Sequence, residues 1–176
     1  QYSPTPFQTY ASQFSLAEGI RRIEFQSQDN VQNVELLKSA TVFVDATAPI
    51  TALSVGAPKH DPGAGQVPPG QPLIVSARTL LSLSSQDPVI KEVASGVRGT
   101  SFRRESDPFA AYTAAFTLPL PDGVKTVEYF AQDNVFNVEA TKSETFALDA
   151  TPPETALRIV GGSQASVPGL GGVAEP

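Results

Sequence analysis

The sequence predicts an all-β fold, a sandwich of short strands, from three observations. Apolar and β-branched stretches of about five to nine residues alternate with Gly, Pro, Asp and Ser. No stretch keeps the 3.6-residue period of an amphipathic helix. A segment near the start, SQDNVQNVELLKSATVFVDATAP (residues 27–49), returns near the end as AQDNVFNVEATKSETFALDATPP (residues 131–153), so the two regions should share one fold.

Strands are expected where the apolar stretches of the middle and later chain lie. These stretches are rich in β-branched and aromatic residues and end at turn residues. They cover residues 51–55, 73–83, 97–104, 114–118, 124–132 and 143–148. From Gly56, the sequence GAPKHDPGAGQVPPGQ is too rich in Pro and Gly for a strand and predicts a loop over one end of the sandwich.

Comparison of the two copies indicates which face of the strand after Gly123 is buried. GIRRIEFQSQD in the first copy aligns with GVKTVEYFAQD in the second, so Gln26 takes the place of Phe130. Side chains alternate between the two faces of a strand. We therefore expect Val127, Tyr129 and Ala131 in the core, with Lys125, Glu128 and Phe130 off that face.

The predicted core draws large apolar residues from all of these strands. Its members are Leu53, Ile74, Leu81, Val97, Phe102, Phe116, Leu118, Val127, Tyr129, Phe146 and Leu148. Burying each contributes about 1.5–3 kcal/mol, so the core can hold a domain that has no disulfides. Val97 and Phe102 have opposite parity, which predicts a β-bulge at Gly99.

The repeat extends beyond the quoted segments. Residues 6–16 align with 108–118 at an offset of 102, residues 19–53 align with 123–157 at an offset of 104, and 24 of these 46 positions are identical. A period near one hundred residues is too long for a solenoid and indicates successive whole domains.

Each copy ends in a linker with proline, VDATAP or LDATPP. Proline cannot donate to a sheet and it stiffens the chain, so the strand ends there. These linkers divide the chain into the C-terminal half of a sandwich (residues 1–46), a complete sandwich (47–152), and the start of a following repeat or a strand-donating tail (153–176).

The composition argues against several classes of function. Lys and Arg number 12 against 18 Asp and Glu, a net charge of -6, so no basic surface is expected for nucleic acid. Without Cys, the chain has neither disulfides nor thiolate metal sites. No apolar run approaches the roughly 20 residues of a membrane span. Abundant Thr, Ser, Pro and Gly favour an extracellular or cell-surface location.

The second copy resembles a known family. PFAAYTAAFTL and DGVKTVEYFAQDNVFNVEATKSETFALDATPP are similar to the bacterial immunoglobulin-like or fibronectin-III-like repeats of large secreted and surface proteins. The resemblance covers residues 6–53 and 97–157, although the family's turn has Gly where this chain has Gln32 and Phe136. It implies an immunoglobulin-like sandwich, one complete and one half repeat here, acting as scaffold or adhesin.

Oxygen-bearing side chains gather at the two hairpins and linkers. One interpretation is a calcium site between domains, since Ca²⁺ takes six to eight oxygen ligands. The candidate ligands are Asp29, Asp45, Asp133 and Asp149. The other interpretation is a hairpin whose Asp and Asn side chains bond their own backbone. The sequence favours the hairpin, because the spacing matches no EF-hand and no cofactor is otherwise indicated.

Residues for catalysis are sparse, and we expect no enzyme. His60 stands in a Pro-Gly loop without a predicted nucleophile beside it. The pairs Glu18 with Glu24 and Glu139 with Glu144 have no predicted cleft across which to act as glycosidase acids.

The sequence therefore predicts a non-enzymatic structural module whose partners are adjacent repeats or other copies of itself. A half-domain of 46 residues lies near the ~40-residue limit for independent folding, so its apolar face should be covered by a strand from a neighbour, giving a fibre or extended array. The candidate interface residues are Phe14, Ile23, Phe25, Phe130, Phe136, Leu157 and Ile159. The alternative is a carbohydrate-binding or adhesive module in which Phe130 and Phe136 bind a glycan.

Overall fold

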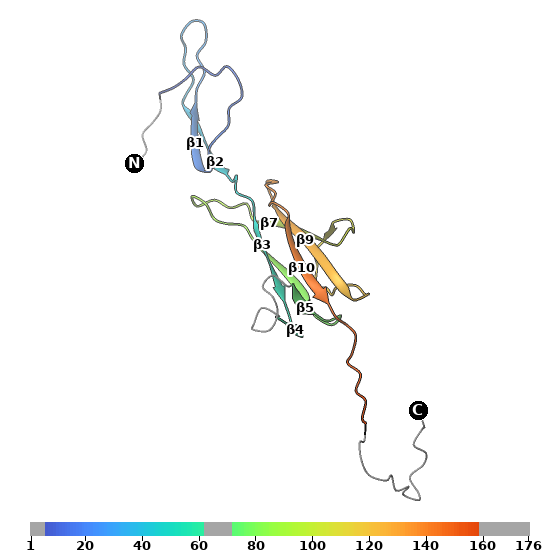
Figure 1. The fold of residues 1–176 in the computed structure, drawn as a ribbon. Helices are drawn as coiled ribbons and strands as arrows, with labels where there is room; N and C mark the ends of the chain where they lie inside the picture. The colour runs from blue at the N-terminus through green and yellow to red at the C-terminus, as the bar shows by residue number, and fades with distance from the viewer. Residues whose placement is uncertain (1–5, 62–71, 159–176) are drawn as a thin grey trace, which may run out of the picture.

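The computed structural model describes residues 6–61 and 72–158, and all regular elements within these ranges are β-strands (Figure 1). The strands are β1 (Gly19–Phe25), β2 (Lys38–Val44), β3 (Ile50–Val55), β4 (Lys59–His60), β5 (Leu73–Val75), β6 (Leu81–Gln86), β7 (Val97–Arg104), β8 (Ala110–Ala111), β9 (Gly123–Asp133) and β10 (Lys142–Leu148). The all-β prediction is confirmed. In the described ranges, no helix has the length and apolarity needed to cross a membrane.

The strands form three sheets. β1 pairs with β2, β3 pairs with β6, and a six-stranded sheet has the order β4-β5-β10-β9-β7-β8. Neighbours are antiparallel except for β5 and β10, which are parallel. The β3–β6 sheet and the six-stranded sheet share one core, an arrangement consistent with a β-sandwich.

The core lies between these two sheets. Its buried residues are Val75, Leu81, Leu83, Leu118, Val127, Tyr129, Phe146 and Leu148. Leu53, Phe102 and Phe116 pack against it while partly buried, and the rings of Phe102 and Phe116 stack 4.3 Å apart. The prediction was wrong at two positions, because Val75 occupies the core in place of Ile74 and Val97 is only half-buried.

The strand predicted over residues 73–83 is broken in two. Between β5 and β6 the chain turns, and the Thr79 N–H donates to the Ser76 carbonyl (3.0 Å). The Ser76 N–H in turn donates to Thr79 Oγ1 (2.9 Å), and Thr79 is fully buried. The hydroxyl supplies the hydrogen bonds that a continuous strand would otherwise provide.

Two further predictions need correction. Residues 114–118 form no strand, and Phe116 makes only an isolated bridge to Leu81, with N–H···O distances of 3.0 and 2.8 Å. The predicted loop from Gly56 contains strand β4, in which His60 pairs with Ile74. Residues 62–71 of that loop lie outside the described residues.

β9 alternates as a two-residue period requires, with Val127, Tyr129 and Ala131 buried. Lys125 was wrongly placed off the core face, since it has the same parity as Val127 and is only 7% exposed. Its ammonium lies 3.5 Å from a carboxylate oxygen of Glu105, so the alkyl stem is buried while the charge has a partner. The β-bulge is confirmed, because the β7–β9 register shifts between Val97 and Gly99.

The β1–β2 hairpin matches the β9–β10 pair in register. Gly19 pairs with Val44 as Gly123 pairs with Leu148, at the same 104-residue offset. No other described strand pairs with β1 or β2. Phe25 is consequently 47% exposed, whereas its counterpart Tyr129 is 3% exposed.

Candidate functional site

The two hairpin loops share the same three hydrogen bonds to an Asp side chain. In the second copy, Asp133 Oδ1 accepts from the N–H groups of Val135 (3.0 Å) and Asn137 (2.7 Å), and Oδ2 accepts from Asn137 Nδ2 (2.7 Å). Asp29 makes the same three bonds at 2.9, 2.8 and 2.8 Å. The two bonds from backbone N–H groups are those of the hairpin interpretation, and the third joins the Asp and Asn side chains. Gln32 and Phe136 both have φ 72°, in the left-handed region that Gly adopts most easily. The repeats that this chain resembles have Gly at this position.

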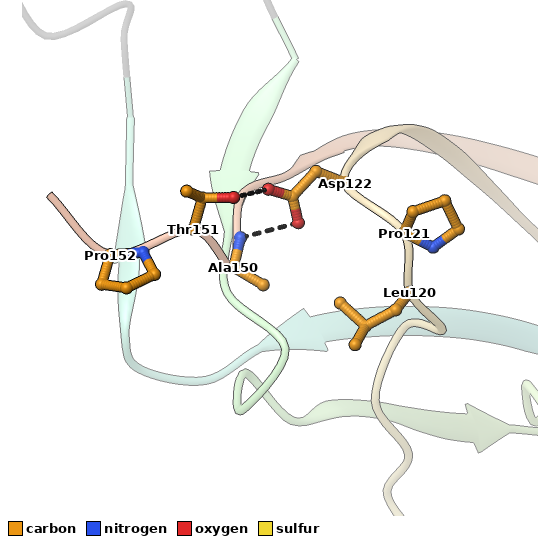
Figure 2. Close-up of a pocket in the computed structure, with 6 residues that line it drawn as sticks. All are labelled: Leu120, Pro121, Asp122, Ala150, Thr151 and Pro152. Atoms are coloured by element: carbon orange, nitrogen blue, oxygen red, sulfur yellow. Dashed lines mark hydrogen bonds between the residues drawn. The ribbon is translucent and has the colours of Figure 1, made fainter.

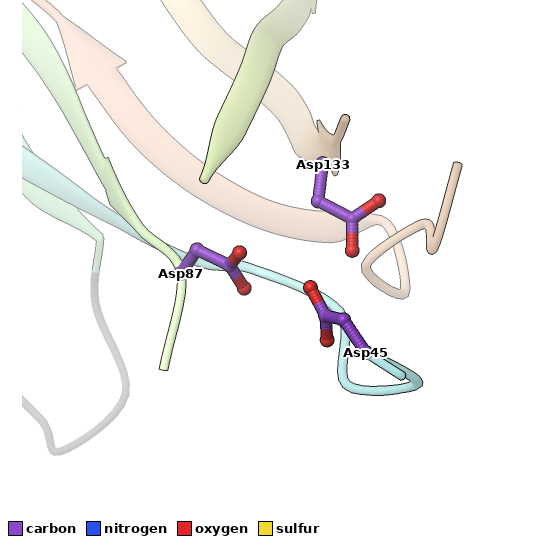
Figure 3. A group of neighbouring side chains, drawn as sticks. All are labelled: Asp45, Asp87 and Asp133. Carbon is purple, nitrogen blue, oxygen red and sulfur yellow. The ribbon is translucent and has the colours of Figure 1, made fainter. Parts of the chain in front are cut away.

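Three carboxylates meet where the first linker touches the second unit (Figure 3). Asp45 follows β2, Asp87 follows β6 and Asp133 ends β9. One carboxylate oxygen from each lies within 4.8 Å of the other two. Asp133 is fully buried, Asp87 is 9% exposed and Asp45 is half-buried. We name these three residues the junction cluster.

Asp45 is held by both units. Its Oδ1 accepts from the N–H of Thr47 (3.1 Å), its Oδ2 accepts from the N–H of Ser95 (2.7 Å), and its carbonyl accepts from Asn137 Nδ2 (3.3 Å). Burial acts to raise the pKa of Asp45, but the hydrogen bonds from Ser95 and Thr47 outweigh it and the pKa lies below its ordinary value. Asp45 is therefore a carboxylate in the fold.

Only one of the two carboxylate oxygens of Asp87 has a hydrogen-bond donor. Its Oδ2 accepts from the N–H of Gly96 (2.7 Å), whereas its Oδ1 is buried and has no hydrogen-bond partner. The neighbouring Ser95 Oγ is also buried without a partner. Buried polar atoms are nearly always paired, so two such oxygens beside one acidic cluster call for an explanation.

The structure brings together only part of the predicted calcium set. Asp45 and Asp133 meet, while Asp29 and Asp149 lie in the corresponding positions of the other repeat boundaries and are absent from the cluster. The sequence prediction missed Asp87. A signal for it existed, because the Gln-Asp pair that precedes both hairpins, at Asp29 and Asp133, occurs a third time at Asp87.

A second polar unit joins the two sheets of the complete domain. The Thr51 N–H donates to Glu139 Oε1 (2.9 Å), and Lys142 Nζ donates to the Thr51 carbonyl (2.6 Å). Glu139 and Lys142 also form an ion pair (2.5 Å), and Glu139 Oε2 accepts from the N–H of Ala131 (3.2 Å). The Glu139–Lys142 pair is therefore hydrogen-bonded to both the N–H and the carbonyl of Thr51 in β3.

Glu139 should make the stability of the domain depend on pH in the acidic range. Burial acts to raise its pKa, but hydrogen bonds from Lys142 and Thr51 outweigh it, so the folded pKa lies below the ordinary value of 4.5. Stability from this carboxylate is therefore present above pH 4.5 and lost as the pH falls through the folded pKa. We expect Glu139→Gln to flatten the decline of melting temperature with acidification. An unchanged slope in Glu139→Gln, with the exposed Glu154→Gln as control, would contradict this role.

A carboxylate also fixes each linker to the strand pair before it. Asp122 accepts from the N–H of Ala150 (2.9 Å) and from Thr151 Oγ1 (2.6 Å), beside an open hollow that Leu120, Pro121 and Pro152 also line (Figure 2). Glu18, at the 104-residue offset, accepts from the N–H of Ala46 (3.2 Å) and from Thr47 Oγ1 (2.6 Å). The polar groups of this hollow thus bond one another, and their arrangement is structural.

The predicted interface residues fall into two groups. On the first unit, Phe14 is 61% and Phe25 47% exposed beside a half-buried Ile23, and all three line a groove between residues 7–14 and the hairpin. On the second, the ring of Phe130 packs against Phe109 (5.0 Å), and Arg98 lies 4.5 Å from the ring centroid of Phe136. Leu157 is 89% exposed, and Ile159 lies outside the described residues.

The predicted catalytic candidates are placed as follows. His60 is exposed in β4, and the carboxylates of Glu18 and Glu139 are engaged by backbone N–H groups. No protein-family model matches the chain, and no curated protein matches it. The function proposed below therefore depends on the geometry of the chain itself.

Proposed function

We propose that this chain is a non-enzymatic structural module of an extracellular or cell-surface protein, built from immunoglobulin-like sandwich repeats joined by stiff linkers. The observation that carries the proposal is the recurrence, 104 residues apart, of the same Asp–Asn hairpin, the same carboxylate-to-linker bonds and the same Glu–Lys pair. Two packed sheets with a parallel β5–β10 pair support the immunoglobulin-like topology.

The contacts at the linker support a role in spacing. Asp45 bonds to Ser95 and Asn137 of the second unit, and Pro49 is fully buried. Gly19 also lies against the second unit, since a Cβ added there would come within 3.1 Å of the Lys91 Cβ. Such contacts restrain one repeat against the next, as an extended array requires.

The first unit has a binding edge for a strand. Glu35 and Lys38 form an ion pair (2.7 Å). They correspond to Glu139 and Lys142, whose side chains hydrogen-bond to the backbone of Thr51 in β3. In the described part of the chain no strand lies on Glu35 and Lys38. The pair is therefore equipped to hold the backbone of a strand equivalent to β3.

The chain carries a second copy of that strand. Residues 155–157 read Thr-Ala-Leu, as do residues 51–53 at the 104-residue offset, and Leu157 is almost fully exposed. The segment after β10 leaves the sandwich at the end opposite to β1 and β2 (Figure 1). A strand that contains Thr155 would therefore come from another copy, with its N–H on Glu35 and its carbonyl on Lys38.

The apolar face of the first unit fits this partner. Phe14 and Phe25 are exposed, whereas their counterparts Phe116 and Tyr129 pack into the core of the second unit. Covering large apolar side chains contributes about 1.5–3 kcal/mol each when burial is complete, which favours association.

The state of association tests the proposal. We expect light scattering on the purified chain to show a mass that rises with concentration. Thr155→Pro should return it to a monomer, because proline lacks the N–H that Glu35 would accept. Thr155→Val keeps the N–H and the β-branched shape, so it should still associate.

A monomer at every concentration, or equal association of Thr155→Pro and Thr155→Val, would contradict assembly through this strand. Binding of the chain to a glycan array, lost in Phe136→Ala, would instead favour the adhesive function. The contacts of Phe130 with Phe109 and of Phe136 with Arg98 support the structural role, because they occupy part of each aromatic surface.

A further inference from the structure

The junction cluster concentrates negative charge in a place with little water. Asp133 is fully buried, Asp87 is nine-tenths buried, and Asp45 is half-buried. Among the ion pairs of the described residues, none involves these three carboxylates. Buried carboxylates without a counter-charge are strongly disfavoured, and like charges close together add to the cost.

Hydrogen bonds leave part of the cluster unsatisfied. Asp133 bonds to its own hairpin loop and Asp45 to Thr47 and Ser95. The carboxylate of Asp87 points toward Asp45 and Asp133 (Figure 3), and its Oδ1 has no donor. An oxygen that is buried, charged and unpaired is suited to a metal ion, which supplies positive charge at the same point.

The geometry points to a calcium site formed by Asp45, Asp87 and Asp133, which holds the first linker against the second repeat. All three ligands are hard oxygens, the type that Ca²⁺ and Mg²⁺ prefer. Ser95 Oγ, which is buried beside the Asp45 carboxylate, is a fourth candidate ligand.

The fixed positions of the ligands favour calcium over magnesium. Their oxygens lie within 4.8 Å of one another, a range that Ca²⁺ can bridge because its bonds are about 2.3–2.6 Å long and its coordination geometry is flexible. Mg²⁺ needs bonds of about 2.0–2.1 Å and near-ideal octahedral geometry, which carboxylates already fixed by other hydrogen bonds supply poorly.

The repeat makes this site periodic. Asp45 belongs to one repeat boundary, and Asp87 with Asp133 belong to the following domain. At the 104-residue offset, Asp149 corresponds to Asp45, and Asp29 corresponds to Asp133. Asp149 thus offers the linker ligand of the next junction, and Asp29 a domain ligand of the preceding one.

Calcium titration of the full chain tests the inference. After removal of divalent cations with EGTA, calorimetry with CaCl₂ should show one saturable site per chain with a Kd below about 1 mM. Asp87→Asn keeps the shape and the acceptor for Gly96 but removes a charge, so Ca²⁺ should bind at least about tenfold more weakly. Asp107→Asn removes an exposed charge outside the cluster and should leave the affinity unchanged.

Melting temperatures separate loss of binding from loss of folding. Ca²⁺ should raise the melting temperature of the natural chain and leave that of Asp87→Asn unchanged, while Asp87→Asn in EGTA should be at least as stable as the natural chain. No saturable binding up to about 10 mM CaCl₂, equal weakening by Asp107→Asn, or equal affinity for MgCl₂ would overturn the site. All ligands come from one chain, so the result is independent of association through Thr155.

Discussion

We expect Leu81→Ala to lower the free energy of unfolding of the complete sandwich by about 2–5 kcal/mol, the cost of removing a buried Leu side chain and leaving a cavity. Leu81 is fully buried, belongs to β6 of the smaller sheet and packs against residues of the larger one. It also bonds through its N–H and carbonyl to Phe116, so the backbone around it cannot collapse freely into the space.

Urea unfolding can measure this loss through tyrosine fluorescence, because the chain has four Tyr and no Trp. Tyr129 lies in the same core and reports on it. Leu80→Ala is the matched control, since Leu80 is 52% exposed and its loss should change stability by no more than about 0.5 kcal/mol. If the two variants lost equal stability, the core between the two sheets would be wrongly placed.

Much of this core could be predicted because long strands carry a readable period. β9 has eleven residues, and its alternation together with the aligned first copy indicated Val127 and Tyr129. β5 has only three residues, Leu-Ile-Val, and a short apolar run carries no alternation. Its parallel pairing with β10 decides that Val75 is buried, and such pairing lies beyond local sequence.

Lys125 shows the two-residue period misapplied. Alternation places it on the face of Val127, whereas we expected it off that face together with Glu128 and Phe130. The ion pair with Glu105, twenty residues earlier in the chain, resolves the conflict, since the charge reaches a partner while the stem stays buried. A contact between such distant residues could not be predicted from the strand itself.

Individual acidic residues of the candidate site could be predicted from the sequence, but their proximity in the fold could not. The repeat drew attention to Asp45 and Asp133 because each has a copy. Asp87 lies outside the aligned segments, and only its Gln-Asp pair, which it shares with Asp29 and Asp133, marked it. Its approach to Asp45 depends on how the linker turns at Pro49 and on the backbone of Ser95 and Gly96, which bonds both carboxylates.

The two hairpin loops allow one hydrogen-bonded unit to be tested in two environments. Asp133 and Asp29 make the same three bonds, yet Asp133 is fully buried and Asp29 is exposed. We expect Asp133→Ala to cost about 2–4 kcal/mol in EGTA, because it leaves donors of Val135 and Asn137 without their charged acceptor. Asp29→Ala should cost much less, because water replaces the carboxylate at an exposed loop.

Hydrogen exchange at the loop amides gives a readout that global unfolding cannot. In Asp133→Ala the N–H of Asn137 should lose protection together with the strand ends that the loop joins, while in Asp29→Ala the change should stay within the first hairpin. Asp133→Asn retains one acceptor but turns an amide toward Asn137 Nδ2, so its loss should fall between those of the natural chain and Asp133→Ala. Equal losses from Asp29→Ala and Asp133→Ala would mean that burial does not set the strength of this unit. In that case the stability of the second hairpin would have to come from its strands rather than from the carboxylate beneath its loop.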